Sequence, residues 1–233
     1  MKRISSLLVV AGITTLSSMQ VSAQSKSLEG AYGQVGIGYE MVSPSLSLGN
    51  INVSGAGTGS FPYSSSISNS NSFAGTVALG YNFPITKDFL LGLGAEYSPI
   101  AGQKANYSGS NPTLGSASGQ YNKQNSYNIF LSPATPIGND GLLYGKVGFT
   151  GASFKSQING GSSNTDNLTG YSLGIGYKQL ITGGLYGFGE VNYASYGNKT
   201  STETASSGGY NLSQSSTFSA NVTNLLVGIG YKF

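Results

Sequence analysis

The last nine residues of the chain alternate between two kinds of side chain, and this alternation limits the possible folds more than any other feature. One set is apolar and ends in two aromatic residues: Leu225, Val227, Ile229, Tyr231 and Phe233. The intervening set is mostly small or charged: Leu226, Gly228, Gly230 and Lys232. A period of two predicts a β-strand. One apolar and one polar face fit a strand with lipid on one side and a polar interior on the other.

The same alternation recurs in seven further segments, at 34–41, 73–83, 89–97, 127–132, 143–150, 171–178 and 185–193. In the last of these, we assign the two faces so that Glu190 points inward. The total of eight strands satisfies the even number that single-chain bacterial barrels require. We therefore predict an all-β protein, an eight-stranded antiparallel up-and-down transmembrane β-barrel. The alternative is a ten-stranded barrel with an extra hairpin in a long connection, which only Ile51 and Val53 indicate.

The connections between the predicted strands alternate in length. Three are short and contain turn-forming residues, at 84–88, 138–141 and 182–184. Four are long and polar, near 43–70, 99–123, 153–167 and 196–218. Short periplasmic turns and long extracellular loops are typical of outer-membrane barrels, so we expect this arrangement, with both termini in the periplasm.

The outward aromatic residues fall at the two ends of the predicted strands. Those next to the short turns are Phe83, Phe89, Tyr177, Tyr231 and Phe233. Those next to the long loops are Tyr39, Phe73, Tyr97, Tyr127, Phe149, Tyr171 and Tyr193. Amphipathic rings favour membrane–water interfaces, so this sorting predicts two aromatic girdles around an aliphatic belt.

The N-terminus has the pattern of a secretory signal peptide. Lys2 and Arg3 precede an apolar run of about ten residues, which is too short to span a membrane as a helix. Small residues then predict cleavage between Ala23 and Gln24, giving a signal peptide at 1–23 and a barrel domain at 24–233. Removing Lys2 and Arg3 lowers the formal charge of +3 by two, to +1, and leaves no Arg, so nucleic-acid binding has no electrostatic basis.

These features together resemble the small outer-membrane β-barrel superfamily of Gram-negative bacteria, in particular opacity-type proteins of the porin family. The segments 170–178 (GYSLGIGYK) and 189–193 (GEVNY) carry the resemblance most visibly. It implies an integral protein of the outer membrane that contacts lipid and lipopolysaccharide. It also implies that the strand ending in Phe233 is the C-terminal assembly signal, recognised by the barrel-assembly machinery after transport by periplasmic chaperones.

The sequence contains little that could support catalysis. Barrel enzymes of similar size resemble one another in depending on a catalytic His, and this chain has neither His nor Cys. Residues 170–174 match the G-x-S-x-G pattern, but Ser172 lies along a predicted strand and has no base to activate it. We therefore expect no enzymatic activity, no catalytic or metal site and no cofactor.

Six inward-facing charged residues are the main candidates for a functional interior. Three acids face three bases: Glu40, Glu96 and Glu190 against Lys146, Lys178 and Lys232. The interior of an eight-stranded barrel is just wide enough for side chains to fill, and buried charges must pair. We interpret the set as a salt-bridge plug, with inward glycines leaving room for large neighbours. The alternative is a narrow polar conduit lined by the same residues.

The function predicted from the sequence is a structural or surface-interaction role in the outer membrane. It would act through the long loops, which are rich in Ser, Asn and Gly. Adaptable binding surfaces often combine Tyr with small polar residues, as these loops do. An extracellular ligand or host surface is therefore a candidate partner. A variable coat without a single ligand remains an alternative for the loops. A small porin that passes ions or very small solutes is the alternative for the whole protein.

Overall fold

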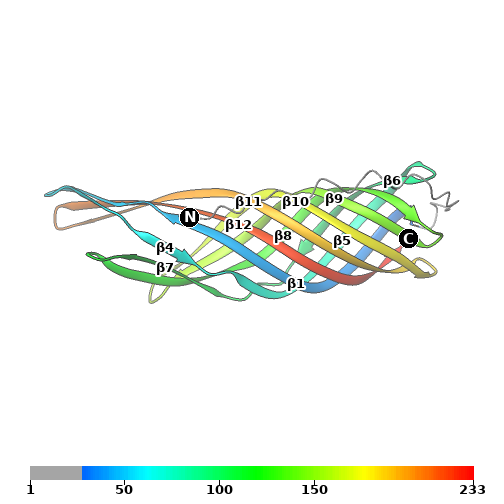
Figure 1. Cartoon of the computed structure of the whole chain (residues 1–233), viewed down its shortest axis with the longest axis horizontal. Coiled ribbons are helices and arrows are strands. Elements are labelled where there is room, and N and C mark those ends of the chain that lie inside the picture. The colour runs from blue at the N-terminus through cyan, green and yellow to red at the C-terminus, as the bar shows by residue number, and fades with distance from the viewer. Residues whose placement is uncertain (1–27) are drawn as a thin grey trace, which may run out of the picture.

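The computed structural model describes residues 28–233, and every regular element among them is a β-strand (Figure 1). The strands are β1 (Gly30–Leu48), β2 (Ile51–Gly55), β3 (Gly59–Phe61), β4 (Ser64–Ile67), β5 (Ser70–Thr86), β6 (Phe89–Ser98), β7 (Ala105–Asn111), β8 (Gly115–Ile137), β9 (Gly141–Ile158), β10 (Ser163–Thr182), β11 (Leu185–Ser207) and β12 (Tyr210–Lys232). The predicted signal peptide and its cleavage site at Ala23–Gln24 lie outside the described residues. None of the described residues forms a helix long and apolar enough to cross a membrane.

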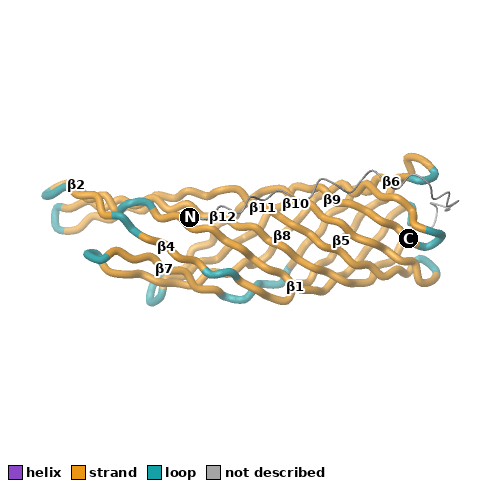
Figure 2. The backbone as a smooth tube through the Cα atoms, viewed as in Figure 1, coloured by secondary structure: helices purple, strands orange, loops and turns teal. Residues whose placement is uncertain are grey.

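Eight strands close into a ring of antiparallel neighbours. Their order is β1, β5, β6, β8, β9, β10, β11 and β12, and β12 pairs with β1 to complete the circle. The closing register sets Tyr39 against Leu225, Ile37 against Val227 and Val35 against Ile229. Figure 2 shows nearly continuous strand backbone, with loops at the two ends and along the side between β4 and β1. The predicted all-β antiparallel barrel fold is confirmed.

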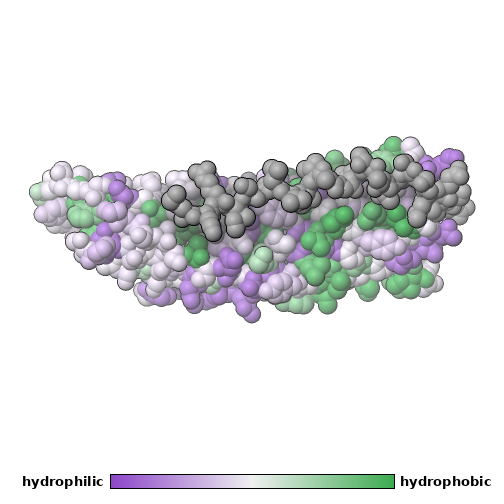
Figure 3. All heavy atoms as spheres, viewed as in Figure 1, coloured by the Kyte–Doolittle hydropathy of each residue, from purple (hydrophilic) through white to green (hydrophobic). Residues whose placement is uncertain are grey.

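The ring is apolar on its outside, as the period-two pattern predicts. The outward side chains of the C-terminal strand are exposed, and Val227 is 57% exposed. Outward residues of the other ring strands, such as Leu79, Ile129 and Ile175, are exposed as well. Figure 3 shows apolar residues on the surface of the ring and mainly polar residues at the opposite end of the molecule. Such a surface suits lipid rather than water as the solvent.

The two ends of the ring differ. At one end, here called the turn end, short turns join β5 to β6, β8 to β9 and β10 to β11, and Gly138, Gly183 and Gly184 adopt positive φ there. L-residues with a side chain rarely take such φ angles, which accounts for glycine at these positions. Phe233 also lies at the turn end, where its backbone N–H donates to the Ala31 carbonyl (2.9 Å).

At the other end, here called the hairpin end, the prediction of long loops is wrong for much of the chain. The predicted loops near 153–167 and 196–218 are mostly strand, because β9–β10 and β11–β12 continue as hairpins to turns at 159–162 and 208–209. Hydroxyl pairs across the strands, such as Thr200–Thr217 (2.9 Å) and Thr202–Ser215 (3.0 Å), support the extension. Rows of hydroxyl residues form strands without the alternating hydropathy that marks a membrane strand.

The whole sheet has 12 strands, not the eight predicted, because four short strands lie at the hairpin end outside the ring. β2 pairs with β12 and with β3, while β4 pairs with β7 and β7 with β8. Ile51 and Val53, which raised the alternative of an extra hairpin, lie on β2. That hairpin extends the sheet beyond the ring and does not widen it to ten strands.

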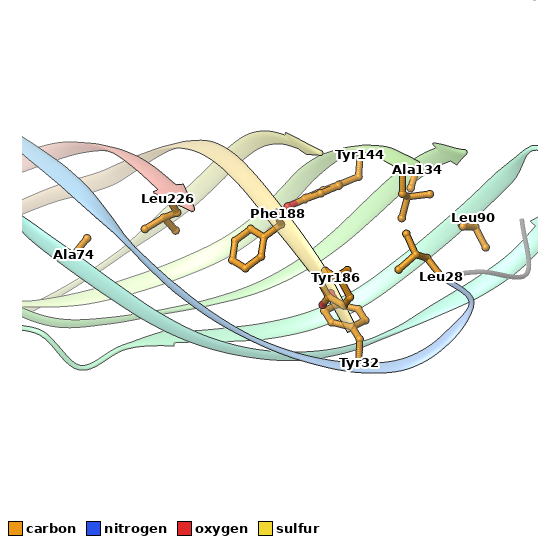
Figure 4. Packing of buried hydrophobic residues seen from close by; sticks show 10 residues of the cluster. Leu28, Tyr32, Ala74, Leu90, Ala134, Tyr144, Tyr186, Phe188 and Leu226 are labelled. Carbon is orange, nitrogen blue, oxygen red and sulfur yellow. The ribbon is translucent and has the colours of Figure 1, made fainter. Parts of the chain in front are cut away.

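Two clusters of buried apolar side chains lie inside the sheet. The first, in the half of the ring nearer the turn end, includes Tyr32, Tyr144, Tyr186 and Phe188 (Figure 4). The second includes Tyr121, Phe154 and Tyr196, with Phe218 packed against it. Phe154 makes edge contacts with Tyr196 (5.7 Å between centroids) and Phe218 (5.4 Å). Charged residues are buried in the same interior.

Candidate functional site

Five aromatic side chains of the interior lie beside a glycine on the neighbouring strand. The register pairs Tyr144 with Gly176, Tyr186 with Gly230, Phe130 with Gly94, Phe188 with Gly228 and Tyr32 with Gly80. A Cβ atom at any of these glycines would collide with the facing ring, and at Gly228 it would also collide with the backbone of β1. The glycines therefore create the space into which the rings of the interior fit.

Lys146 and Glu190 form the central ion pair of the interior. The Lys146 Nζ lies 2.8 Å from Glu190 Oε1 and 3.2 Å from Glu96 Oε2, and both Lys146 and Glu190 are buried. Lys146 is on β9 and Glu190 on β11, so the intervening strand β10 must leave room for their contact. Gly174 is opposite Lys146 and Gly176 opposite Glu190, and neither adds a side chain between them.

The remaining bonds of this group satisfy the Glu190 carboxylate. The Tyr144 hydroxyl donates to Glu190 Oε2 (2.7 Å), and Asn192 Nδ2 donates to Oε1. The ammonium of Lys146 also lies 4.3 Å from the centre of the Phe130 ring. One ammonium thus lies within ion-pair distance of two carboxylates. Hydrogen bonds and cation–π contact offset part of the desolvation of such charges.

A second ion pair joins Glu40 to Lys123, a residue of the loop predicted near 99–123. Lys123 is only 1% exposed, and its Nζ lies 2.7 Å from Glu40 Oε2 and 3.0 Å from Ser126 Oγ. The prediction of a loop near 99–123 is wrong here, because β8 begins at Gly115 and carries Tyr121 and Lys123 on its inner face. A β-bulge between Lys123 and Ser126 separates this stretch from the predicted strand.

Lys178 is buried and forms no close ion pair among the described residues. Among the described residues, no acid lies within 4.0 Å of its Nζ, which instead lies 3.7 Å from the ring centre of Tyr32, 5.0 Å from Tyr186 and 5.3 Å from Tyr144. The alternation of the strands predicts that the three acids face Lys146, Lys178 and Lys232. The structure pairs them with Lys146 and Lys123, while Lys232 is half-exposed near the turn end.

A small polar cavity of about 30 Å³ lies among these charged groups, lined in part by Glu40, Glu96, Asn128, Thr150 and Asn192. That volume suffices for about two water molecules. Ser172, the serine of the G-x-S-x-G match, also lines it and donates to Asn128 Oδ1 (2.8 Å). Its hydroxyl therefore belongs to the hydrogen-bond network of the interior. The described residues contain no group of three or more His, Cys, Asp or Glu side chains arranged to hold a metal ion.

The residues of the predicted girdles all lie on the outer surface. Near the hairpin end they fall opposite one another on neighbouring strands, as Tyr39 with Phe73, Tyr97 with Tyr127, and Phe149 with Tyr171. Tyr193 is exposed too, and so are those nearer the turn end: Phe83, Phe89, Tyr177, Tyr231 and Phe233. Their role at membrane interfaces stays a prediction, as does the role of the C-terminal strand as an assembly signal.

Several solved structures are similar to this chain at low sequence identity. OprG, an outer membrane protein from Pseudomonas aeruginosa, is 13% identical, with a TM-score of 0.55 over 91% of this chain and 99% of that chain. Ail, the attachment invasion locus protein of Yersinia pestis, in complex with the heparin analogue sucrose octasulfate, is 15% identical, with a TM-score of 0.42 over 88% and 99%. The outer membrane protease OmpT from Escherichia coli is 10% identical, with a TM-score of 0.46 over 93% and 99%.

At such identities, structural likeness shows the fold alone. No curated protein matches the sequence significantly. The family model described as "Outer membrane protein beta-barrel domain" matches residues 9–233. With the closed antiparallel ring and its apolar outer surface, this match shows that the chain belongs to the outer membrane protein beta-barrel domain family.

Proposed function

We propose that the protein is an integral outer-membrane barrel with a closed interior, and that it acts at the cell surface through its long β-hairpins. The observation that carries the proposal is the group around Lys146, which reaches β6, β9 and β11 through Glu96 and Glu190. A path for solutes would have to separate these ion pairs, and breaking a buried pair is strongly unfavourable.

The interior offers a second obstacle between this group and the turn end. Tyr32, Tyr144 and Tyr186 surround the Lys178 ammonium, and the Tyr186 hydroxyl donates to Gln34 Oε1 (3.1 Å). The rings lie over glycines of neighbouring strands, so the backbone itself holds them in place. Closed interiors are usual for barrels of this strand number, where side chains fill the available space.

In the proposed orientation, the turn end with Phe233 faces the periplasm and the hairpins face outward. Short periplasmic turns and longer extracellular connections support this direction. The first described residues also lie at the turn end, where Gly30 pairs with Asn82, so both ends of the mature chain would be periplasmic. Lipid and lipopolysaccharide would surround the ring, and assembly would use the barrel-assembly machinery and periplasmic chaperones.

The protein is proposed not to be an enzyme. The chain has no His, and the Ser172 hydroxyl is engaged by Asn128 within the interior. A hydrolase needs a base to activate such a nucleophile and access for its substrate.

A small porin is the second candidate, and the polar cavity among the charged residues favours it. Single-channel recording of the refolded full chain in a planar bilayer separates the two functions. We expect no steady open steps from the parent. The double variant Lys146→Ala with Tyr186→Ala serves as the positive control, because it shortens one side chain in each barrier and should conduct. Steady steps from the parent, well above the bare bilayer, would overturn the closed interior and establish the porin.

A further inference from the structure

The outer part of β11 has a free edge. β10 pairs with β11 only as far as Gly170 opposite Tyr196, whereas β11 continues to Ser207. Among the described residues, the segment 199–207 pairs with β12 alone. This segment is called the β11 edge below. Its backbone N–H and C=O groups on the side away from β12 have no strand neighbour, and such groups form a template for another strand.

A β-bulge directs this edge away from the ring. The register between β11 and β12 shifts between Tyr196 and Lys199, where one extra residue is inserted on β11. Bulges bend the strand that carries them and increase its twist. Figure 1 shows β11 and β12 continuing with β2 into one arm at the hairpin end, while β7 and β8 lie in a separate arm. The edge therefore lies along the side of a protruding arm.

The inner face of this arm is more apolar than its outer face. Ala205, Leu212 and Val53 form a row of neighbouring residues across β11, β12 and β2. Glu203 and Gln214 are neighbours in the next row on this face, and Ile51 lies two residues before Val53 on β2. Leu212, Val53 and Ile51 are half-exposed. An added strand would extend these rows beside Ala205 and Glu203, where a small apolar and a basic side chain fit best.

The outer face of the arm has little left to offer a ligand. The Thr200, Thr202 and Ser206 hydroxyls already bond to Thr217, Ser215 and Asn211 on β12. No residue of the β11 edge is Pro, and only Lys199 and Glu203 are charged. The edge thus carries few of the features that usually block strand addition.

We infer that the β11 edge is a docking site for an extended polypeptide segment, which adds to the sheet as a further strand. Strand addition gives affinity through main-chain hydrogen bonds and selectivity through alternate side chains. The preferred segment carries a basic residue opposite Glu203, an acidic residue opposite Lys199 and an apolar residue opposite Ala205. This inference rests on the proposed function, since the hairpins must face the exterior to meet a partner there.

A peptide copied from the chain itself is the probe for this site. In the peptide 210–219 (YNLSQSSTFS), residues 210–218 already pair with the opposite edge of β11, so their side chains suit its two faces. The full chain, labelled with ¹⁵N and refolded in nanodiscs, is titrated with this peptide. We expect amide shifts and slower hydrogen exchange within 199–207. The Gln214→Lys peptide should bind roughly two- to fivefold more tightly, because it faces Glu203.

Two controls decide the outcome. A peptide of the same sequence with alternate backbone nitrogens methylated keeps its side chains but cannot form the ladder, and it should not bind. The protein variant Glu203→Lys should reverse the preference for the Gln214→Lys peptide. Any of three results would overturn the docking site. The methylated peptide binds as well as the parent peptide, the amide shifts are confined to other strands, or no amide shift occurs at millimolar peptide. Conductance of the parent would overturn the closed interior and leave the peptide result standing, so the two failures are distinguishable.

Discussion

Breaking the ion pair between Lys146 and Glu190 should reveal whether the buried charges act as one network. In the variant Lys146→Met, the Glu190 and Glu96 carboxylates both lose their only ammonium partner within 4.0 Å among the described residues. Removing one partner of a buried pair destabilises a protein by about 3–5 kcal/mol. Because two acids are left uncompensated, we expect Lys146→Met to fall at the upper end of this range.

The variant Glu190→Gln should be less damaging. Lys146 keeps its contact with Glu96 at 3.2 Å, and the amide of Gln still has an oxygen to accept from Tyr144 or Asn192. We expect a loss near 3 kcal/mol, the lower end of the same range. In the double variant Lys146→Met with Glu190→Gln, Glu96 remains buried, but the uncompensated charge of Glu190 is absent. The double variant should therefore lose less stability than the sum, with a coupling of about 1–3 kcal/mol.

Reversible urea unfolding of the four proteins in lipid vesicles measures these free energies. The matched control is Ser72→Ala, because the Ser72 Oγ is buried and has no hydrogen-bond partner among the described residues. Removing this hydroxyl should leave stability unchanged or raise it slightly. Strict additivity of Lys146→Met and Glu190→Gln would refute the network. It would mean that the two side chains are hydrated independently, as in a water-filled path.

Three further perturbations test other parts of the structure. Val227→Lys should destabilise the barrel by about 2–4 kcal/mol in vesicles, since Val227 points outward at 57% exposure, and unchanged stability would contradict the assignment of faces. Deleting Phe233 should lower the amount of protein at the cell surface more than it lowers the refolding yield in detergent. If neither quantity falls, Phe233 is not part of an assembly signal. Lys178→Met should raise the unfolding free energy by about 1 kcal/mol, because it removes a buried charge without an acid within 4.0 Å. A loss of more than about 2 kcal/mol would instead mean that the contacts with the tyrosine rings dominate.

The ring could be predicted from the sequence because lipid imposes a strict rule on each strand. Every second residue must be apolar, so Val227 and Ile37 could be placed on the outer face from spacing alone, and the structure sets them opposite each other. Ile51 and Val53 gave a weaker signal of the same kind and mark β2. The extended hairpins were not predicted, because strands surrounded by water need no alternation of apolar and polar residues. Thr200 and Thr217 pair through hydroxyls, which leave no difference in hydropathy between neighbouring residues.

The partners of the buried charges could not be assigned, because they depend on the register between strands far apart in the sequence. Glu40 required a base nearby, but Lys123 is 83 residues away and follows a segment rich in Ser, Gly and Asn. A bulge after Lys123 also shifts the alternation, so the predicted strand from Tyr127 does not extend back to it in phase. The sequence predicts how many acids point inward, but it does not predict which bases pair with them.

The inward glycines carry information about register that hydropathy does not. Gly176 faces Tyr144 and Gly230 faces Tyr186, so these large rings of the interior require a residue without a side chain on the adjacent strand. Pairing inward rings with inward glycines would therefore restrict the register of neighbouring strands from the amino-acid sequence alone. The same rule explains how charges can meet across β10, because Gly174 and Gly176 leave Lys146 and Glu190 free to touch. Space left by glycine, as much as attraction between charges, therefore determines which acids and bases pair inside this barrel.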